Sequence, residues 1–181
     1  MKFSVLGPLE VVDQGSPISL GSAKQRLLLA ALLVHANTVV SADRLADILW
    51  GDAPPLDAAA TLQNYVSRVR AALEPGRGSR GAGTVLLTRS PGYLLRTRQD
   101  EVDASRFEQL VAEGRVALRE GDQAGAAKRL GEALALWRGP ALAEFADEPF
   151  ARAEAARLHE LRLSALEDRI EAELTLGRHG E

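Results

Sequence analysis

Apolar residues at the start of the chain follow the pattern of short strands. They concentrate in segments 3–6, 9–12 and 17–20, and turn-forming sequence at 13–16 separates the last two. Short apolar runs bounded by glycine, proline and aspartate are typical of strands joined by tight turns. The pattern therefore predicts a small antiparallel sheet at the amino terminus.

Three helices are predicted after this sheet, over residues 22–35, 41–51 and 57–74. Each segment starts with a serine or an aspartate, whose side-chain oxygen can accept a hydrogen bond from a free backbone N–H of the first turn. Residues 39–40 form a brief extended link between the first two helices. The third helix has an apolar face suited to a core, made by Leu62, Val66, Val69 and Leu73.

A hairpin is predicted after the third helix. Segments 84–89 and 93–96 have the composition of strands, and Ser90-Pro91-Gly92 between them is turn sequence. The preceding stretch, 76–83, is rich in glycine, arginine and serine and is expected to be a mobile loop. Three helices followed by a hairpin are the pattern of a winged helix.

After Asp103 the whole pattern is helical. One apolar stripe runs over 107–118 and stops at Gly121-Asp122, a second runs over 126–137 and stops at Gly139-Pro140, and a longer helix is expected from about Pro149 toward Leu176. The short turn between the first two predicts an antiparallel helical hairpin. Its small residues predict a close approach of the two helices: Gly114, Ala117 and Ala126.

The longest helix carries two apolar stripes, as expected of a helix packed between two neighbours in a solenoid of the tetratricopeptide kind. The stripes are Leu158, Leu161 and Ala165, and then Leu163, Leu166, Ile170 and Leu174. The second stripe has no partner in the sequence, so we expect the sequence to be part of a longer protein. The fold class predicted is mainly α with small β, a winged helix followed by an all-α tetratricopeptide-like domain.

Charge divides the chain into two parts. Residues 1–98 hold 11 lysines and arginines against 7 aspartates and glutamates, a net charge of +4, and residues 99–181 hold 11 against 18, a net charge of −7. The first part can approach phosphate, whereas the acidic second part is more suited to meeting a protein. We therefore expect two domains, 1–98 and 99–181, with the boundary near 97–103.

Composition excludes several classes of protein. The sequence has no cysteine, which rules out a disulfide scaffold, an iron–sulfur cluster and a thiol nucleophile. No apolar run approaches the roughly 18 residues of a membrane span, and no signal peptide is present, so a cytoplasmic location is expected. The three histidines, His35, His159 and His179, lack metal-site spacing and are expected to be structural or surface residues. No nucleotide-binding or hydrolase motif occurs, so we expect no cofactor, no metal and no enzymatic activity.

The polar face of the third helix carries the candidate chemistry. Amides pair with adenine edges, arginine pairs with guanine or phosphate, and hydroxyls pair with either. Opposite the core face stand Thr61, Gln63, Asn64, Ser67, Arg68 and Arg70. The same pattern is compatible with a plain solvated helix face, and both interpretations remain open at this point.

Cations near this helix favour DNA over the solvated face. Arg89 stands just before the tip of the hairpin, where a wing would insert it into a minor groove. Ser22, Lys24 and Arg26 stand at the start of the first helix, where free N–H groups and positive charge favour a phosphate. Arg77 and Arg80 fit a flexible solvated loop better, with at most nonspecific attraction to DNA.

Residues 1–98 resemble the DNA-binding domain of the OmpR type, a winged helix preceded by a small sheet. The matching stretches are Leu49-Trp-Gly51, Leu62-Gln-Asn-Tyr-Val-Ser-Arg-Val-Arg-Ala-Ala-Leu73 and Thr88-Arg-Ser-Pro-Gly-Tyr-Leu-Leu95. Residues 103–181 resemble the bacterial transcriptional activation domain, through Asp103-Ala-Ser-Arg-Phe107, Ala133-Leu-Ala-Leu-Trp-Arg-Gly-Pro140 and Leu161-Arg-Leu-Ser-Ala-Leu-Glu-Asp-Arg-Ile-Glu-Ala-Glu-Leu174. Together the two halves resemble the Streptomyces antibiotic regulatory protein (SARP) family.

The resemblance implies a transcriptional activator that binds direct repeats in double-stranded DNA as a side-by-side dimer and recruits RNA polymerase holoenzyme, at genes of antibiotic biosynthesis. It implies base contacts from Thr61, Gln63, Asn64, Ser67 and Arg68, a phosphate contact from Arg70 and a minor-groove contact from Arg89. It also implies that Trp50, Gly51 and Asp52 belong to a loop that approaches the DNA backbone or the polymerase.

The sequence departs from the family in two respects. The activation domain of the family normally continues for several more helices, so dimerisation is not assured by this sequence. No receiver domain precedes the winged helix, so control by aspartyl phosphorylation is not expected.

A rival interpretation is a protein-interaction adaptor whose winged helix does not read DNA, and the mild charge of the first half keeps that alternative open. Nothing in the residues identifies a ligand for the helical half.

Overall fold

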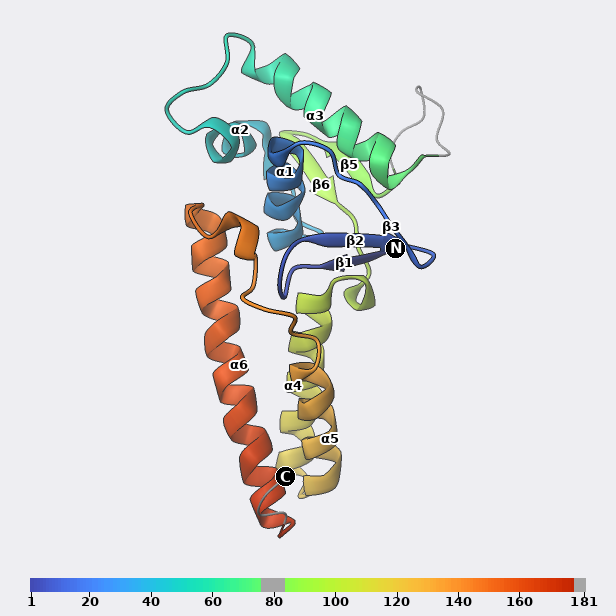
Figure 1. Ribbon diagram of the computed structural model, residues 1–181, viewed down its shortest axis with the longest axis vertical. Coiled ribbons are helices and arrows are strands. Elements are labelled where there is room, and N and C mark those ends of the chain that lie inside the picture. The colour runs from blue at the N-terminus through green and yellow to red at the C-terminus, as the bar shows by residue number, and fades with distance from the viewer. Residues whose placement is uncertain (76–83, 178–181) are drawn as a thin grey trace.

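A computed structural model describes residues 1–75 and 84–177 of the chain. The chain is mainly helical with two small antiparallel sheets, as the sequence predicts. In Figure 1, α3 lies across one end of the molecule, the three longest helices of the second half run toward the other end, and the amino-terminal sheet lies between them. The predicted loop 76–83 lies outside the described residues.

The amino-terminal sheet has the strand order β1-β2-β3. Both pairings are antiparallel, and Phe3 stands opposite Val11. The side chains of both residues are buried. The strands are β1 (Lys2–Ser4), β2 (Glu10–Asp13) and β3 (Ser16–Pro17). The sheet predicted for this segment is therefore present.

Three helices follow, with the predicted caps on the last two. The Ser41 hydroxyl accepts a hydrogen bond from the backbone N–H of Arg44 at 3.2 Å, and the Asp57 carboxylate accepts one from Ala60 at 2.9 Å. Each cap satisfies a donor that has no partner within its helix. The helices are α1 (Ala23–Val34), α2 (Ala42–Trp50) and α3 (Ala58–Leu73).

The wing belongs to a second sheet with the strand order β4-β6-β5. The segment expected to be a plain link at 39–40 contributes a short strand that pairs with β6. Gly92 is required at this pairing, because a Cβ there would lie 1.9 Å from the carbonyl oxygen of Val40. The strands are β4 (Val40–Ser41), β5 (Leu86–Arg89) and β6 (Gly92–Leu95).

The second half of the chain is helical. α4 and α5 form the predicted antiparallel hairpin and pack closely, since a Cβ on Gly114 would lie 2.7 Å from Leu130 Cγ. α6 packs along α5. The elements are the 3-10 turn η1 (Gln99–Glu101), α4 (Asp103–Arg119), α5 (Gln123–Leu134), the 3-10 turn η2 (Ala143–Phe145) and α6 (Pro149–Thr175).

The expected extension of the second stripe to Trp137 is wrong in its secondary structure. α5 ends at Leu134, and Trp137 lies beyond it, with its ring edge-on to Phe107 at a centroid distance of 5.4 Å. The backbone N–H of Arg138 donates to the carbonyl of Leu6 at 2.8 Å. The chain leaves the helix early, where its backbone bonds to the amino-terminal segment and the Trp137 ring packs on Phe107 of α4.

The two stripes of α6 differ in exposure, as predicted. Leu158 and Ala165 of the first stripe are fully buried. The second stripe is exposed by 43% to 52%, at Leu163, Leu166, Ile170 and Leu174. No helix in the described part of the chain is long and apolar enough to cross a lipid bilayer.

The predicted boundary between the halves is closely packed. Leu6 belongs to the core of the helical half, and Leu142 and Phe145 belong to the core of the winged helix. The Asp103 carboxylate accepts hydrogen bonds from the backbone N–H groups of Val5 at 2.7 Å and Leu6 at 3.0 Å. Burial raises the pKa of this carboxyl, and the two N–H donors oppose that rise. The halves are therefore joined by shared side chains and not by a free linker.

Candidate nucleic-acid interface

The polar face of α3 is directed to solvent. Its buried residues are those of the predicted core face: Leu62, Val66, Val69 and Leu73. Gln63, Asn64, Ser67 and Arg68 are exposed, and Thr61 is half-buried. Figure 1 shows α3 at one end of the molecule, and the exposure of these side chains directs the polar face to solvent.

Two side chains on this face are pre-arranged. Arg68 Nε donates to Asn64 Oδ1 across one turn of helix at 3.2 Å, which places a guanidinium and an amide side by side. These groups are the ones that pair bidentately with guanine and adenine edges in a major groove. The Thr61 hydroxyl donates to the carbonyl of Asp57 at 2.7 Å, so its proton is engaged and its oxygen remains an acceptor.

Arg70 has a different environment from Arg68. Its Nε donates to the carbonyl of Leu86 and its Nη2 to the hydroxyl of Thr88, both at 2.7 Å, and its guanidinium lies 5.9 Å from the centroid of the Tyr93 ring. These contacts join α3 to both strands of the hairpin. A phosphate would have to compete with them, and the phosphate contact of Arg70 stays a prediction.

Arg89 stands at the tip of the wing. It is the last residue of β5, opposite Gly92, and its side chain is exposed. Among residues 1–75 and 84–177, no hydrogen-bond or ion-pair partner of its guanidinium is found. The side chain is therefore available at the place where the sequence predicts a minor-groove contact.

The residues at the start of α1 are engaged within the chain. Lys24 Nζ donates to the carbonyl of Leu49, and Arg26 donates to the Leu9 carbonyl at 2.7 Å and to Glu144 at 2.8 Å through Nε. The hydrogen bond from Arg26 lowers the pKa of the Glu144 carboxyl. The backbone N–H of Ser22 donates to the side-chain oxygen of Gln25 at 3.3 Å. The spacing of Ser22 and Gln25 is that of a capping box, whereas no sequence signal marks the partners of Lys24 and Arg26. Phosphate contacts from this group stay predictions.

The loop between α2 and α3 is exposed beside the polar face of α3. Trp50 is half-buried against Tyr65 of α3, with ring centroids 6.2 Å apart. Gly51 ends α2 with a φ of +54°, which favours glycine, and Asp52 is exposed. Leu56 in this loop is fully exposed. Sequence analysis did not single out Leu56, although an apolar residue within a proline-containing loop is a signal that could have been used.

The remaining candidates fall outside this surface. Arg77 and Arg80 lie outside the described residues, as does His179. His35 Nε2 lies 3.0 Å from an Arg44 nitrogen, and burial together with Arg44 lowers the pKa of His35. His159 is exposed on α6. The described part of the chain contains no cluster of three or more metal-ligating side chains.

Two models of protein families match the chain. Residues 15–95 match the family described as "Transcriptional regulatory protein, C terminal", and residues 102–181 match the family described as "Bacterial transcriptional activator domain". Both matches correspond to the resemblance stated from the motifs. Residues 1–14, which form β1 and β2, lie outside both.

Known relatives share this arrangement. The chain is 38% identical to the regulatory protein DnrI of Streptomyces peucetius over 99% of this chain and 67% of DnrI. It is 37% identical to the regulatory protein AfsR of Streptomyces coelicolor, over 100% of this chain but only 17% of AfsR. A solved structure, Mycobacterium tuberculosis EmbR in complex with a low-affinity phosphopeptide, superposes with a TM-score of 0.91 at 35% identity, over 98% of this chain and 46% of EmbR. The chain thus spans less than half of two of these three relatives.

With both family matches in chain order and a relative covered over two thirds of its length, the chain belongs to the Streptomyces antibiotic regulatory protein family of transcriptional regulators, and not to a family of enzymes.

Proposed function

We propose that this protein is a sequence-specific transcriptional activator that binds direct repeats at promoters and recruits RNA polymerase. The observation that carries the proposal is the solvent-directed polar face of α3 beside the unpartnered Arg89 of the wing. A helix face of amides, hydroxyls and arginine at the end of a molecule suits a major groove, and a cation on a neighbouring hairpin suits the adjacent minor groove.

The division of charge supports an orientation on DNA. The half that carries α3 has a net charge of +4, and the helical half has −7. Repulsion between the acidic half and phosphate favours α3 toward the duplex and α6 away from it. In this orientation residues 1–98 read DNA and residues 99–181 serve as the activation domain.

Binding to direct repeats determines the kind of contact between protomers. Two protomers on direct repeats face the same way, so each presents one surface to a different surface of its neighbour. Such a contact can form on DNA without a stable dimer in solution. The loop between α2 and α3, with the exposed Leu56, is the surface we assign to polymerase, because it stands beside the DNA-reading face. By its family, the genes it controls would be those of antibiotic biosynthesis.

The test is a titration of the protein against a fluorescent promoter fragment with tandem repeats and against a scrambled fragment, at two salt concentrations. We expect tighter binding to the repeats, and a preference that persists when the salt is raised, because base contacts do not depend on counterion release. Weak binding that is equal for both fragments and disappears with salt would contradict the proposal. That outcome would favour the adaptor, whose winged helix does not read DNA.

A further inference from the structure

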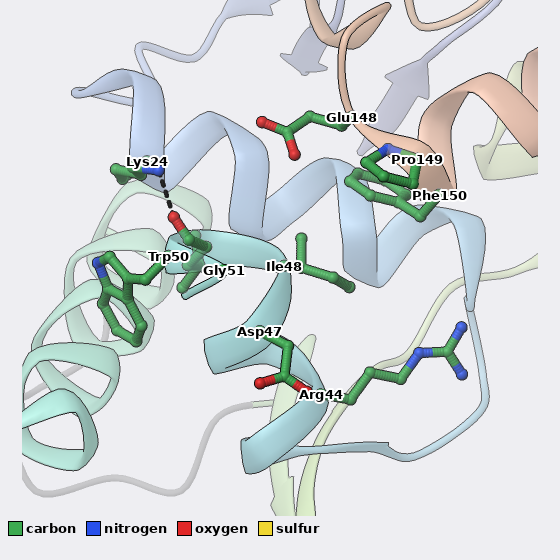
Figure 2. A pocket seen from close by; sticks show the side chains of 10 residues that line it. Lys24, Arg44, Asp47, Ile48, Trp50, Gly51, Glu148, Pro149 and Phe150 are labelled. Carbon is green, nitrogen blue, oxygen red and sulfur yellow. Dashed lines mark hydrogen bonds between the residues drawn. The ribbon is translucent and has the colours of Figure 1, made fainter. Parts of the chain in front are cut away.

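A cavity of about 520 Å³ lies where the winged helix meets the helical half. Its walls come from α2 on one side and from the first residues of α6 on the other (Figure 2). This volume is within the usual range of small-molecule pockets, ~300–1,000 Å³, and domain junctions are common places for them. None of its residues belongs to the polar face of α3 or to the wing.

The apolar part of the wall is suited to a flat or aromatic group. Ile48 and Trp50 come from α2, and Pro149 and Phe150 come from the start of α6. In Figure 2, Trp50 and Phe150 lie on opposite sides of Ile48. The side chains of Ile48, Trp50 and Phe150 are half-buried, so each keeps apolar surface that the protein itself does not cover.

The charged part of the wall holds two cations, each with one engaged donor, and two carboxylates. Lys24 Nζ donates to the Leu49 carbonyl at the end of α2, and an Arg44 nitrogen lies 3.0 Å from His35 Nε2. Glu148 is half-buried and Asp47 is exposed, and neither carboxylate has a hydrogen-bond or ion-pair partner in the described part of the chain. Lys24 and Arg44 keep further N–H donors, so the charges of the lining balance, and Glu148 is the half-buried charged group left without any partner in the described part of the chain.

We propose that this cavity binds a small organic cation, an ammonium group on an aromatic or apolar body. The ammonium lies at the Glu148 carboxylate, which Figure 2 shows above Ile48, and the body lies over Ile48 between Trp50 and Phe150. A charge-assisted hydrogen bond to Glu148 favours a cation over an anion of the same shape.

A molecule bound in the cavity can affect α3 through the contact between Trp50 and Tyr65. Trp50 packs on Tyr65 of α3, and Phe150 lies in the first turn of α6, so a bound molecule touches both halves at once. An effect on DNA binding rests on the proposed function. Binding of the cation does not depend on DNA binding, and the test contains no DNA. A failure of the cation site therefore leaves the proposed function intact, and a failure of the proposed function leaves the cation site intact.

The test uses 2-phenylethylammonium as the probe and 3-phenylpropionate as its anionic counterpart, titrated into the whole chain by isothermal calorimetry. The two tryptophans of the chain are Trp50 and Trp137, so fluorescence of the Trp137→Phe variant reports on Trp50 alone. We expect saturable binding of the ammonium with a change in Trp50 fluorescence. We expect binding of the propionate to be weaker by roughly tenfold or more, the scale of one charge-assisted hydrogen bond.

Two variants localise the site. Glu148→Gln keeps the size of the side chain and removes its charge, and should weaken binding of the ammonium by roughly tenfold. Glu160→Gln, an exposed carboxylate three turns further along α6, should bind it as the unaltered protein does. The proposal is overturned if no saturable binding occurs, if the propionate binds as well as the ammonium, or if the two variants bind alike.

Discussion

Arg68 and Arg70 stand two positions apart on α3 and lie in different environments. Two residues of helix turn the side chain by roughly 200°, so the first is directed to solvent and the second to the hairpin. Within residues 1–75 and 84–177, Arg68 donates only to Asn64 on its own helix, whereas Arg70 bonds to Leu86 and Thr88. Their residue type suggests one role for both, but their contacts separate a side chain directed to solvent from one that joins α3 to the hairpin.

Replacing Arg68 by alanine should reduce binding to the promoter repeats by about 1–3 kcal/mol and relax the preference for them over scrambled DNA. The reason is the loss of a bidentate contact to a base edge. The measurement is the fluorescence titration with both fragments. Arg119→Ala, which removes an exposed arginine at the far end of α4, is the control and should change neither value. A uniform loss for both fragments in Arg68→Ala would mean that this arginine contacts phosphate only.

At the scale of elements, α3 and the wing form one unit because Arg70 connects them. The carbonyl of Leu86 and the ring of Tyr93 belong to β5 and β6, so the guanidinium touches both strands. The spacing between α3 and the wing, which we propose enter the major and the minor groove, is thereby fixed in the free protein. DNA binding then needs less ordering, which favours affinity.

Replacing Arg70 by alanine should lower the free energy of unfolding by about 1–3 kcal/mol, because the Leu86 carbonyl loses its donor in a partly buried place. Urea unfolding of the free protein measures this change. Arg68→Ala is the matched control and should lie within about 0.5 kcal/mol of the unaltered protein. Equal stability of the two variants, with weaker DNA binding in Arg70→Ala, would instead favour the phosphate contact.

The loop between α2 and α3 is the second element with a separable role. Replacing Leu56 by serine should reduce transcription from the target promoter several-fold and leave DNA affinity unchanged, because the side chain is fully exposed and supports no core. In vitro transcription with purified polymerase and a parallel DNA titration provide the two readings. Val39→Ser, at an exposed apolar residue before β4 in the winged-helix half, serves as the control. Unchanged transcription in Leu56→Ser would move the polymerase contact elsewhere.

Local signals predicted most elements, and distant partners could not be predicted. The caps of α2 and α3, the four apolar positions of α3 and the turn of the wing follow from spacing within a few residues. The polar face of α3 followed from the same periodicity. The pairing of Arg26 with Glu144 joins positions 118 residues apart, and no periodicity of the sequence encodes it. For the same reason the strand pairing of residues 40–41 and the early end of α5 were missed.

At the scale of the whole molecule, the two halves are connected by charge as well as by packing. Glu144 accepts hydrogen bonds from Arg26 and from the backbone N–H of Leu9, which lies 2.7 Å away. Asp103 accepts two more from Val5 and Leu6. Both carboxylates come from the second half and both hold the segment between β1 and β2. The amino-terminal sheet is thus positioned by the helical half.

The Arg26–Glu144 pair should give stability a defined dependence on pH. The pKa of Glu144 is lower in the folded chain than its ordinary value of 4.5, so its contribution is complete above pH 4.5 and is lost as the pH falls through the folded-state value. Glu144→Gln keeps an acceptor for Leu9 and removes the charge. It should cost about 1 kcal/mol at pH 7, since the pair is partly exposed.

Thermal unfolding between pH 3 and pH 7 tests this dependence. The difference between the unaltered protein and Glu144→Gln should shrink as the pH falls below 4.5. Asp103, whose pKa is shifted upward, contributes equally to both proteins and cancels from the difference. Glu160→Gln should follow the unaltered protein at every pH. A difference that stays constant over this range would remove the ion pair as its cause.

Leu6 of the first half packs in the helical core, and Leu142 of the second half packs in the winged-helix core. This exchange of side chains limits where two members of the family can recombine. A chimera joined near residue 98 would bring Leu142 from one parent into a winged-helix core from another, and would leave Leu6 in a foreign helical core. Each misfit leaves a void or a clash in a close-packed interior. Recombination between relatives should therefore succeed mainly where both positions come from one parent, so that the pair of domains is inherited as a single piece.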